Sequence, residues 1–271
     1  MKNSIIIFYL LLTTAITAQT SGENKIDAAG KKQGYWIKMD PKTGKKAYEG
    51  NFKNDKPQGV FKYYHVGMDS LRTRMDFRQD GKIAYATMYT MEGKLQAKGK
   101  YIDEKKDSTW TYYDDQGKLL TMENYTDGKK NGKSIVYYQN GNVSEERIYK
   151  MDVQDGPFKS YYDDKKVKAE GTYQNGILVG KNAFYFPSGT AAAIGNYDKG
   201  VKKGVWIYNK PDGKFDSREI WVNGKMLEGK ALEDYLKKNK GTESLSGGEE
   251  FQKKNTGTRP ADKPKSGTKK K

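Results

Sequence analysis

The chain has 271 residues, enough for one or two ordinary domains, but 31% of them are charged and only 35% are hydrophobic. This composition excludes a bundle of transmembrane helices. With no cysteine and one histidine, His65, the chain cannot form disulfides or Cys/His zinc sites, and it has no thiol nucleophile. Most Ser-His and Cys-His catalytic arrangements are excluded as well.

The N-terminal eighteen residues have the organisation of a secretory signal peptide. Lys2 supplies a positive charge, residues 5–12 form an apolar run, and the small residue Ala18 precedes the expected cleavage site. The run is about half the length of a membrane-spanning helix, so a cleaved signal is favoured over a retained anchor. No cysteine follows it, which excludes lipid attachment of the bacterial lipoprotein kind. We expect a secreted or periplasmic mature chain that starts at Gln19 and opens with a linker, residues 19–33.

An internal repeat of 24 or 25 residues occupies residues 34–226. Residues 171–180 (GTYQNGILVG) and residues 195–204 (GNYDKGVKKG) share one spacing of glycine and tyrosine. The same frame predicts eight units, which start at Gly34, Gly59, Ala84, Ser108, Gly132, Gly156, Gly180 and Gly204. Self-similarity of this period is typical of repeat architectures.

Further positions of the frame keep their residue type. Two residues after the start, five of the eight units carry a large aromatic residue: Trp36, Phe61, Trp110, Phe158 and Trp206. Five residues after the start, six units carry tyrosine: Tyr64, Tyr89, Tyr113, Tyr137, Tyr161 and Tyr185. Nine or ten residues after the start there is usually a glycine.

Each unit reads as two short strands joined by turns. Aromatic and β-branched residues suit a half-buried strand, as in residues 110–113. Dipeptides that suit tight hairpin turns lie between the strands: Asp127-Gly128, Asn140-Gly141, Asn175-Gly176, Asp212-Gly213 and Asn223-Gly224. One hairpin is marginal in water, so each unit must bury its aromatic face on its neighbours. The sequence therefore predicts an all-β protein, an elongated array of about eight 24-residue hairpins.

The Gly-x-Tyr-x-x-Gly-x-x-x-Gly frame, with its aromatic and tyrosine positions, resembles the MORN repeat, in the bacterial variant found in exported and antitoxin-like proteins. The resemblance covers residues 34–226. It implies a non-enzymatic module for protein or lipid interaction, and it implies no cofactor. The second and third units, residues 59–107, depart from the frame and lack several glycines. We expect them to be distorted or bulged.

Two segments follow the array. Residues 227–240 place Ala231, Leu232, Tyr235 and Leu236 on one side of a predicted helix, which we interpret as a cap on the last hairpin in preference to a docking helix. Residues 241–271 are mostly Gly, Ser, Thr, Lys and Glu, and cannot bury enough apolar surface to fold. They predict a disordered basic tail.

The acidic pairs in the array do not favour catalysis. Asp114-Asp115 and Asp163-Asp164 both follow a Tyr-Tyr pair just before a turn, which indicates turn chemistry. Neighbours on a strand point to opposite faces, whereas a glycosidase needs two carboxylates across one cleft. Glu145-Glu146 has the character of a solvated strand edge, and the lone His65 has no candidate partner. We therefore predict no catalytic residue, no metal site and no enzyme.

The candidate binding surface combines tyrosines and lysines of the repeats. It consists of Tyr113, Tyr137, Tyr161, Tyr185, Lys129, Lys130, Lys202 and Lys203. A row of tyrosine rings could stack on an extended ligand, or could simply form the core. Most of the net charge of +16 lies on the array, where it is spread over the repeats and where lysine protects sheet edges or attracts an anionic surface. We do not expect the protein to bind nucleic acid, because the sequence contains no recognisable nucleic-acid-binding motif.

The sequence therefore predicts an exported, non-catalytic interaction or scaffold protein of the cell envelope, with protein partners there. One alternative is a protein that binds glycan, anionic polymer or a lipid surface through the tyrosines and lysines. A second alternative, which follows from the resemblance, is an antitoxin-like protein that binds a toxin. An export signal disfavours the second alternative.

Overall fold

A computed structural model describes residues 23–239 of the chain. This range forms 19 β-strands and one α-helix, which confirms the predicted all-β array of hairpins with a short C-terminal helix. The chain divides into two compact units, each of which contains several of the hairpin repeats. Unit 1 contains the residues up to 143 together with 149–152, and unit 2 contains residues 144–148 and those from 153 onward. The predicted signal peptide, residues 1–18, and the predicted tail, residues 241–271, lie outside the described residues.

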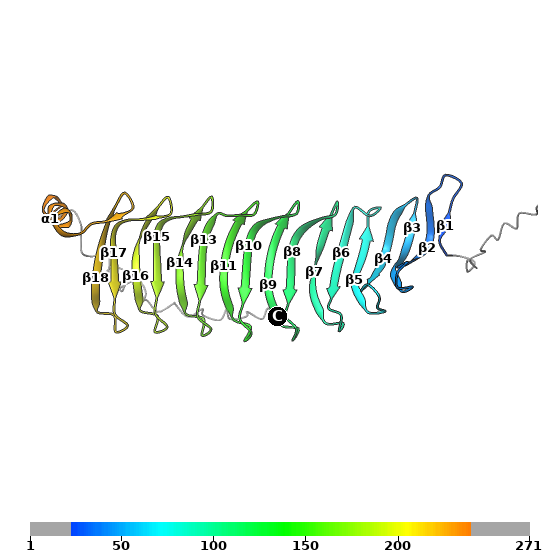
Figure 1. Cartoon of the computed structure of the whole chain (residues 1–271), viewed down its shortest axis with the longest axis horizontal. Helices are drawn as coiled ribbons and strands as arrows, with labels where there is room; N and C mark the ends of the chain where they lie inside the picture. Colours follow the sequence, from blue (N-terminus) through cyan, green and yellow to red (C-terminus); the bar gives the residue numbers. More distant parts are fainter. Residues whose placement is uncertain (1–22, 240–271) are drawn as a thin grey trace, which may run out of the picture. The chain divides into compact units, whose positions relative to one another are not determined.

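In unit 1 every strand pairs antiparallel with the next strand in the sequence (Figure 1). The strands are β1 (Lys25–Ile26), β2 (Lys32–Met39), β3 (Lys46–Lys53), β4 (Lys56–Tyr64), β5 (Leu71–Arg78), β6 (Ile83–Tyr89), β7 (Leu95–Ile102), β8 (Lys105–Tyr113), β9 (Leu119–Thr126) and β10 (Lys129–Tyr137).

The segment predicted as a linker, residues 19–33, contains a short strand. In β1, Lys25 and Ile26 pair with β2, which itself begins at Lys32. The side chain of Asn24 accepts a hydrogen bond of 2.9 Å from the backbone N–H of Ile37. These bonds satisfy backbone groups of β2 that would otherwise form an open sheet edge.

Unit 2 repeats the same up-and-down arrangement. It holds residues 144–148 of β11 (Val143–Lys150), which pair with β13, followed by strands that pair in sequence order. These are β12 (Val153–Gln154), β13 (Gly156–Tyr161), β14 (Val167–Gln174), β15 (Ile177–Tyr185), β16 (Ala191–Asp198), β17 (Val201–Asn209), β18 (Phe215–Val222) and β19 (Lys225–Met226).

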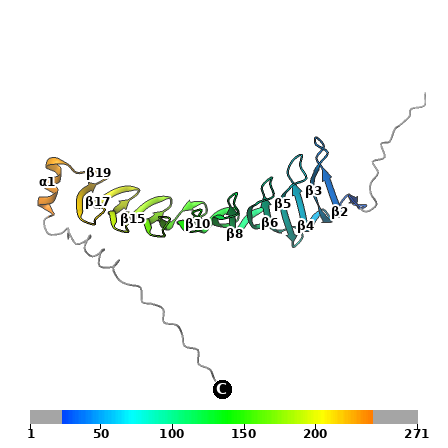
Figure 2. The same ribbon diagram turned by 90° about the horizontal axis from the view of Figure 1, so that it is seen from below.

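The helix α1 (Gly229–Lys238) lies beside the β18–β19 end of unit 2, inside the segment 227–240 that was predicted to be helical (Figure 2). Its apolar side chains Leu232, Tyr235 and Leu236 are half-buried, and none of its residues is fully buried. Lys237 and Lys238 occupy its last turn, where positive charge suits the helix dipole.

Two kinds of turn alternate along each unit. Asp127 and Gly128 form a two-residue turn with φ of 52° and 83°, the conformation that asparagine, aspartate and glycine tolerate best. Asn175-Gly176 and Asn223-Gly224 form turns of the same kind. The prediction of tight turns at Asn140-Gly141 and Asp212-Gly213 is wrong. Both lie in longer loops, in which the side chains of Asn140 and Asp212 accept backbone hydrogen bonds of 2.9 and 3.0 Å.

A β-bulge marks the start of most repeats. Between β3 and β4 the pairing shifts register between Glu49 and Asn51, and Gly59 at that place has a φ of 65°. The third repeat starts with Ala84, where β5 and β6 pair without a shift. Alanine does not readily adopt a positive φ, and the bulge is missing where Ala84 replaces the glycine. The third repeat therefore differs from the others by the absence of this bulge.

Three large rings in the core are each placed on a glycine of the preceding strand. Phe61 lies over Gly50, Trp110 over Gly99 and Trp206 over Gly195. A Cβ atom added at Gly99 would be 2.2 Å from the Trp110 ring. Trp110 is 0% exposed and Trp206 is 1% exposed. Glycine is therefore required here because the ring occupies the space of a side chain.

In the third and fifth repeats both the ring and the glycine are missing, whereas the seventh repeat keeps Gly171 and places the buried side chain of Asn182 on it. Ala86 replaces the ring in the third repeat, and Met75 stands opposite it. Ser134 replaces the ring in the fifth repeat, and Glu123 stands opposite it. In the third and fifth repeats the preceding strand thus supplies side-chain volume where the ring is absent, as close packing requires.

We predict that Gly99→Ala will lower the free energy of unfolding by about 1–3 kcal/mol, because the added methyl group overlaps the Trp110 ring. The measurement is urea unfolding of Gly99→Ala, Trp110→Ala and the double variant. Trp110→Ala empties the space, so Gly99→Ala should cost less in that background. Equal costs in the two backgrounds would contradict the packing argument.

Candidate functional site

The two faces of the sheet carry different chemistry. Because side chains alternate along a strand, Trp110 and Tyr112 share one face of β8 and Thr111 lies on the other. Tyr113 follows a register shift and joins Thr111, whose hydroxyl lies 3.3 Å from the tyrosine hydroxyl. We call the face with the buried rings the tryptophan face and the opposite face the tyrosine face.

On the tryptophan face of unit 1, a lysine side chain covers the buried ring. The Nζ of Lys106 lies 4.6 Å from the centre of the Trp110 ring and 5.1 Å from the centres of the Tyr112 and Tyr125 rings. It donates a hydrogen bond of 2.7 Å to the Tyr112 hydroxyl. The carbon stem of the lysine thus shields the ring while its ammonium group keeps polar partners.

Unit 2 contains the same arrangement 96 residues later, which is four repeats of 24. The Nζ of Lys202 lies 4.8 Å from the Trp206 ring centre and 5.0 Å from that of Trp221. It donates to the Tyr208 hydroxyl and to the Glu219 carboxylate, at 2.6 and 2.9 Å. Burial by itself lowers the pKa of Lys202, but these two partners outweigh it and raise the pKa.

The tyrosine face has a recurring bond between residues fifteen positions apart. The hydroxyls of Tyr64 and Tyr185 donate to the carboxylates of Glu49 and Glu170, at 2.7 and 2.8 Å. Tyr161 donates to Glu146 at 3.2 Å in the same relation. The equivalent partner of Tyr137 is the sulfur of Met122, at 3.3 Å, and that of Tyr113 is Lys98, whose ammonium lies 5.7 Å from the ring centre.

The eight residues of the predicted binding surface are not brought onto one face. Tyr113, Tyr137, Tyr161 and Tyr185 lie on the tyrosine face, and Tyr185 is only 7% exposed. Lys130 and Lys202 cover rings or carboxylates on the tryptophan face. Lys129 is exposed at the start of β10, and Lys203 pairs with Asp198 at 2.8 Å. The unforeseen register shift before each tyrosine separates the two groups.

The acidic candidates are used by local structure. The Asp114 carboxylate accepts backbone hydrogen bonds from Gln116 and Lys118, both at 2.9 Å, as in an Asx turn. Asp164 pairs with Lys166 at 2.8 Å. His65 lies in the loop between β4 and β5. Among residues 23–239, no group of three or more His, Asp or Glu side chains could hold a metal ion.

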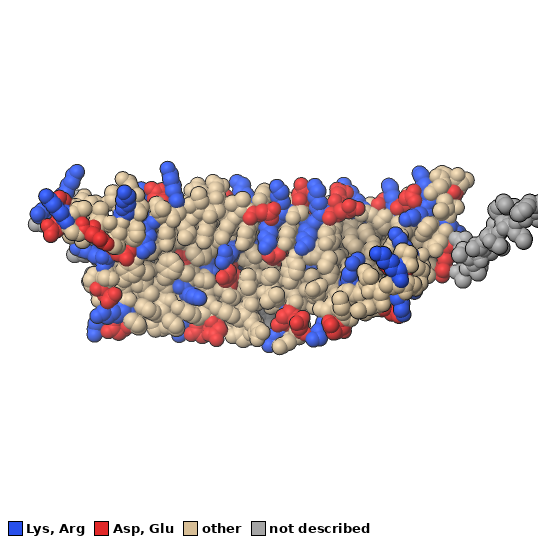
Figure 3. Space-filling view, in the orientation of Figure 1, with Lys and Arg blue, Asp and Glu red and all other residues tan. Residues whose placement is uncertain are grey.

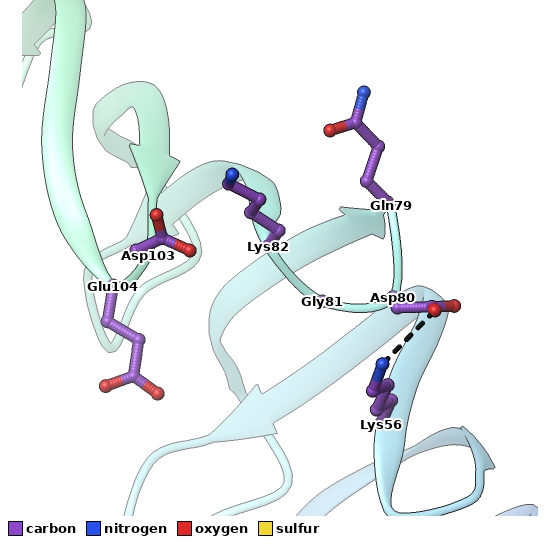
Figure 4. A pocket seen from close by; sticks show the side chains of 7 residues that line it. All are labelled: Lys56, Gln79, Asp80, Gly81, Lys82, Asp103 and Glu104. Atoms are coloured by element: carbon purple, nitrogen blue, oxygen red, sulfur yellow. Dashed lines mark hydrogen bonds and ion pairs between the residues drawn. The ribbon is translucent and has the colours of Figure 1, made fainter.

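An open hollow of about 540 Å³ lies at the tight-turn edge of unit 1 (Figure 4). It is lined by Lys56, Gln79, Asp80, Gly81, Lys82, Asp103 and Glu104. The turn between β5 and β6 spans residues 79–82, longer than the other turns of this edge, which creates the hollow. The Asp80 carboxylate pairs with Lys56 at 3.3 Å across it. The lining thus mixes two lysines with three carboxylates, one of them already paired, and we assign it no ligand.

The repeat frame also carries residues that the sequence reasoning missed. Three positions before the start of a repeat, unit 1 has lysine in every repeat except the third, which has Gly81, whereas unit 2 has Val153, Ile177 and Val201. These three side chains are 44%, 45% and 48% exposed. On the tyrosine face, Arg74 and Lys98 take the position that Glu49 holds in its own repeat. Comparing the residue types at every position of the repeat, including the polar positions, would have revealed both the aliphatic residues of unit 2 and the cations Arg74 and Lys98.

Comparison with known proteins supports the repeat. Residues 130–151 and 154–175, two adjacent repeats, match the model of the family described as MORN repeat variant. No curated protein matches the chain. Within residues 23–239, no helix is long and apolar enough to cross a membrane.

Several solved structures show a weak likeness. A TarM mutant from S. aureus, in complex with fondaparinux, alpha-GlcNAc-glycerol and UDP, is 13% identical over 42% of this chain and 19% of its own, with a TM-score of 0.21. The GtfA/B complex bound to UDP and GlcNAc is 9% identical over 48% and 25%, with a TM-score of 0.20. TcdB2-TccC3 is 13% identical over 74% and 13%, with a TM-score of 0.21. The chain spans at most a quarter of each of these structures, and we draw no functional argument from them.

The structure also makes one carboxylate a determinant of acid stability. The side chain of Glu49 is 9% exposed. Burial by itself raises its pKa, but bonds from Lys46, Tyr64 and Lys62 outweigh burial and lower the pKa from 4.5 to about 2. Its contribution to stability is therefore present above pH 4.5 and is lost as the pH falls toward 2.

We predict that Glu49→Gln will make the free energy of unfolding less dependent on pH in the acid range. The free energy of unfolding of the unmodified chain should fall by about 2–3 kcal/mol more than that of the variant between pH 5 and pH 2. Urea unfolding at a series of pH values measures this difference. Parallel acid limbs for the two proteins would show that Glu49 has no such role.

Proposed function

We propose that this chain is an exported, non-catalytic interaction and scaffold protein of the cell envelope. The repeated sheet supports a non-catalytic role, because its acidic side chains serve turns and tyrosine hydroxyls. The apolar run of residues 5–12, with Lys2 before it and Ala18 after it, supports export. The MORN repeat variant match supports a repeat module of this type.

The observation that carries the interaction role is an exposed apolar ladder in unit 2. We define it as Val153, Ile177 and Val201, which occupy one position in three successive repeats. Each lies against the glycine of the following turn, Gly176, Gly200 and Gly224, so the three aliphatic side chains form a regular edge. Equivalent strands are two strand spacings apart, which places the side chains about 10 Å from one another.

The equivalent edge in unit 1 carries charged side chains, which favour solubility. Lys56 and Lys105 occupy the ladder position there, and they pair with Asp80 and Asp127 at 3.3 and 2.7 Å. Lysine at a sheet edge prevents association, whereas a row of aliphatic side chains favours it. The partner that fits is a protein segment with aliphatic side chains every 10 Å or so, the spacing of every seventh residue on an amphipathic helix.

We predict that the mature chain, from Gln19, will capture one envelope protein and that capture will persist at high salt, because the contact is apolar. Val153→Lys, Ile177→Lys and Val201→Lys together give unit 2 the lysine edge of unit 1 and should abolish capture. The matched control changes three other exposed apolar residues, Val60, Leu120 and Met151, to lysine. Capture that survives in the ladder variant, or that is lost equally in the control, would refute the ladder as the contact.

We also predict that the cellular form of the protein begins at Gln19 and fractionates with the envelope or the medium. Intact-mass measurement of the protein from each fraction tests this directly. An unprocessed chain in the cytoplasm would refute export and would favour the antitoxin-like alternative.

A further inference from the structure

One position on the tyrosine face changes the sign of its charge along unit 1. The position lies fifteen residues before each tyrosine of the face, and its occupants are Glu49, Arg74, Lys98, Met122, Glu146 and Glu170. The three glutamates each bind the tyrosine hydroxyl that follows. Arg74 and Lys98 put a cation where those repeats have a carboxylate.

The strand register brings a third cation beside these two. Lys62 pairs directly with Arg74, and Arg74 pairs with Thr87, which pairs with Lys98. We call Lys62, Arg74 and Lys98 the cation row. Directly opposed side chains are about 5 Å apart, and Lys98 lies two strands, about 10 Å, beyond Arg74. All three residues are exposed.

The protein neutralises the cation row only in part. Arg74 makes no hydrogen bond or ion pair with any residue from 23 to 239. Lys62 shares the Glu49 carboxylate, at 3.3 Å, with Lys46, which is closer at 2.7 Å. Like charges directly opposite in an antiparallel pair are destabilising, so the Lys62–Arg74 pair costs free energy until an anion binds between them.

The surroundings of the cation row add hydrogen-bond donors and an exposed ring. Thr111 and Lys98 act on the Tyr113 hydroxyl and lower its pKa against the opposing effect of burial. Tyr85 lies two residues from Thr87 on the same face, is 46% exposed and has the Arg78 guanidinium 5.3 Å from its ring centre. A half-exposed aromatic ring beside fixed cations suits a sugar ring that carries acidic groups.

Two other acidic residues nearby, Asp76 and Asp107, do not cancel this potential. Asp76 pairs with Arg78 at 3.2 Å, and Asp107 pairs with Lys100 at 3.1 Å, so each acid already has its own cation. On the face of the molecule that Figure 3 shows, positive and negative side chains are interspersed. The excess that remains on the tyrosine face of unit 1 is the cation row.

We infer that the cation row, with Tyr85 beside it, is a binding site for a linear anionic polysaccharide. Three cations in a line about 15 Å long exceed the size of a single phosphate or sulfate group and match successive acidic groups along one chain. The site lies in unit 1, whereas the apolar ladder lies in unit 2. It therefore goes beyond the protein-binding role proposed above, and either can fail without the other.

The test uses dextran sulfate, with uncharged dextran of the same length as the control ligand, and the mature chain at low ionic strength. Arg74→Glu with Lys98→Glu installs the residue that three other repeats carry at this position. The variant should fold, because each glutamate can accept a bond from the following tyrosine as Glu49 does from Tyr64. Its thermal unfolding midpoint should equal or exceed that of the unmodified chain, and Arg74→Gln with Lys98→Gln provides a second, neutral variant.

The control variant has the same net charge but leaves the row intact. Lys53→Glu with Lys129→Glu changes two exposed lysines beside the tight turns of the same unit. We expect the row variant to weaken dextran sulfate binding about tenfold or more and the control to weaken it less than about threefold, because only the row positions its cations together. Uncharged dextran should not bind.

Three results would overturn the inference. Equal weakening in the row and control variants would mean that binding follows net charge alone. Unchanged binding in the row variant would place the polymer elsewhere. Binding to phosphatidylglycerol vesicles that depends on the row, without any binding to dextran sulfate, would identify a membrane surface as the ligand.

Discussion

The packing of a large ring on a glycine of the preceding strand is the interaction on which the structure depends. A sheet of hairpins has no second layer, so a ring can be buried only if the strand beneath it gives up a side chain. Trp110 over Gly99 and Trp206 over Gly195 meet this condition. The third and fifth repeats, which lack the ring, carry Met75 and Glu123 in place of the glycine. The residue types at these two positions of the repeat therefore show which of the two strands fills the space between them.

The same single layer explains much of the basic composition. A ring that is buried from one side still has to be shielded from water on the other, and the long stem of a lysine does this while its ammonium group remains hydrogen-bonded. Lys106 and Lys202 do so in the two units. Other lysines protect the turn edges by pairing with aspartates. Part of the +16 charge is thus structural.

Function in such an array arises from departures from the repeat. In most repeats a given position holds a side chain that packs on, or pairs with, a neighbouring residue. When the residue type changes at that position and the neighbour stays the same, the new side chain becomes available for binding. The cation row reverses the charge beside a retained tyrosine, and the apolar ladder replaces lysine at a retained turn edge. Each departure leaves the hairpin intact because the rings and glycines that hold it are elsewhere. The array can therefore acquire binding sites with little effect on its stability.

The sequence by itself determined the hairpin array, its period and its eight unit starts, because turn residues and buried rings act over a few positions and recur. It also indicated that Asp114 and Asp164 serve turns. Only the tertiary structure decided which face each side chain takes. A register shift before each tyrosine moves Tyr113 and Tyr185 to the face opposite Lys130 and Lys202, so residues that look like one surface in the sequence are separated. Cross-strand register depends on bulges and on packing between strands, and neither can be read from the spacing of residues along one strand.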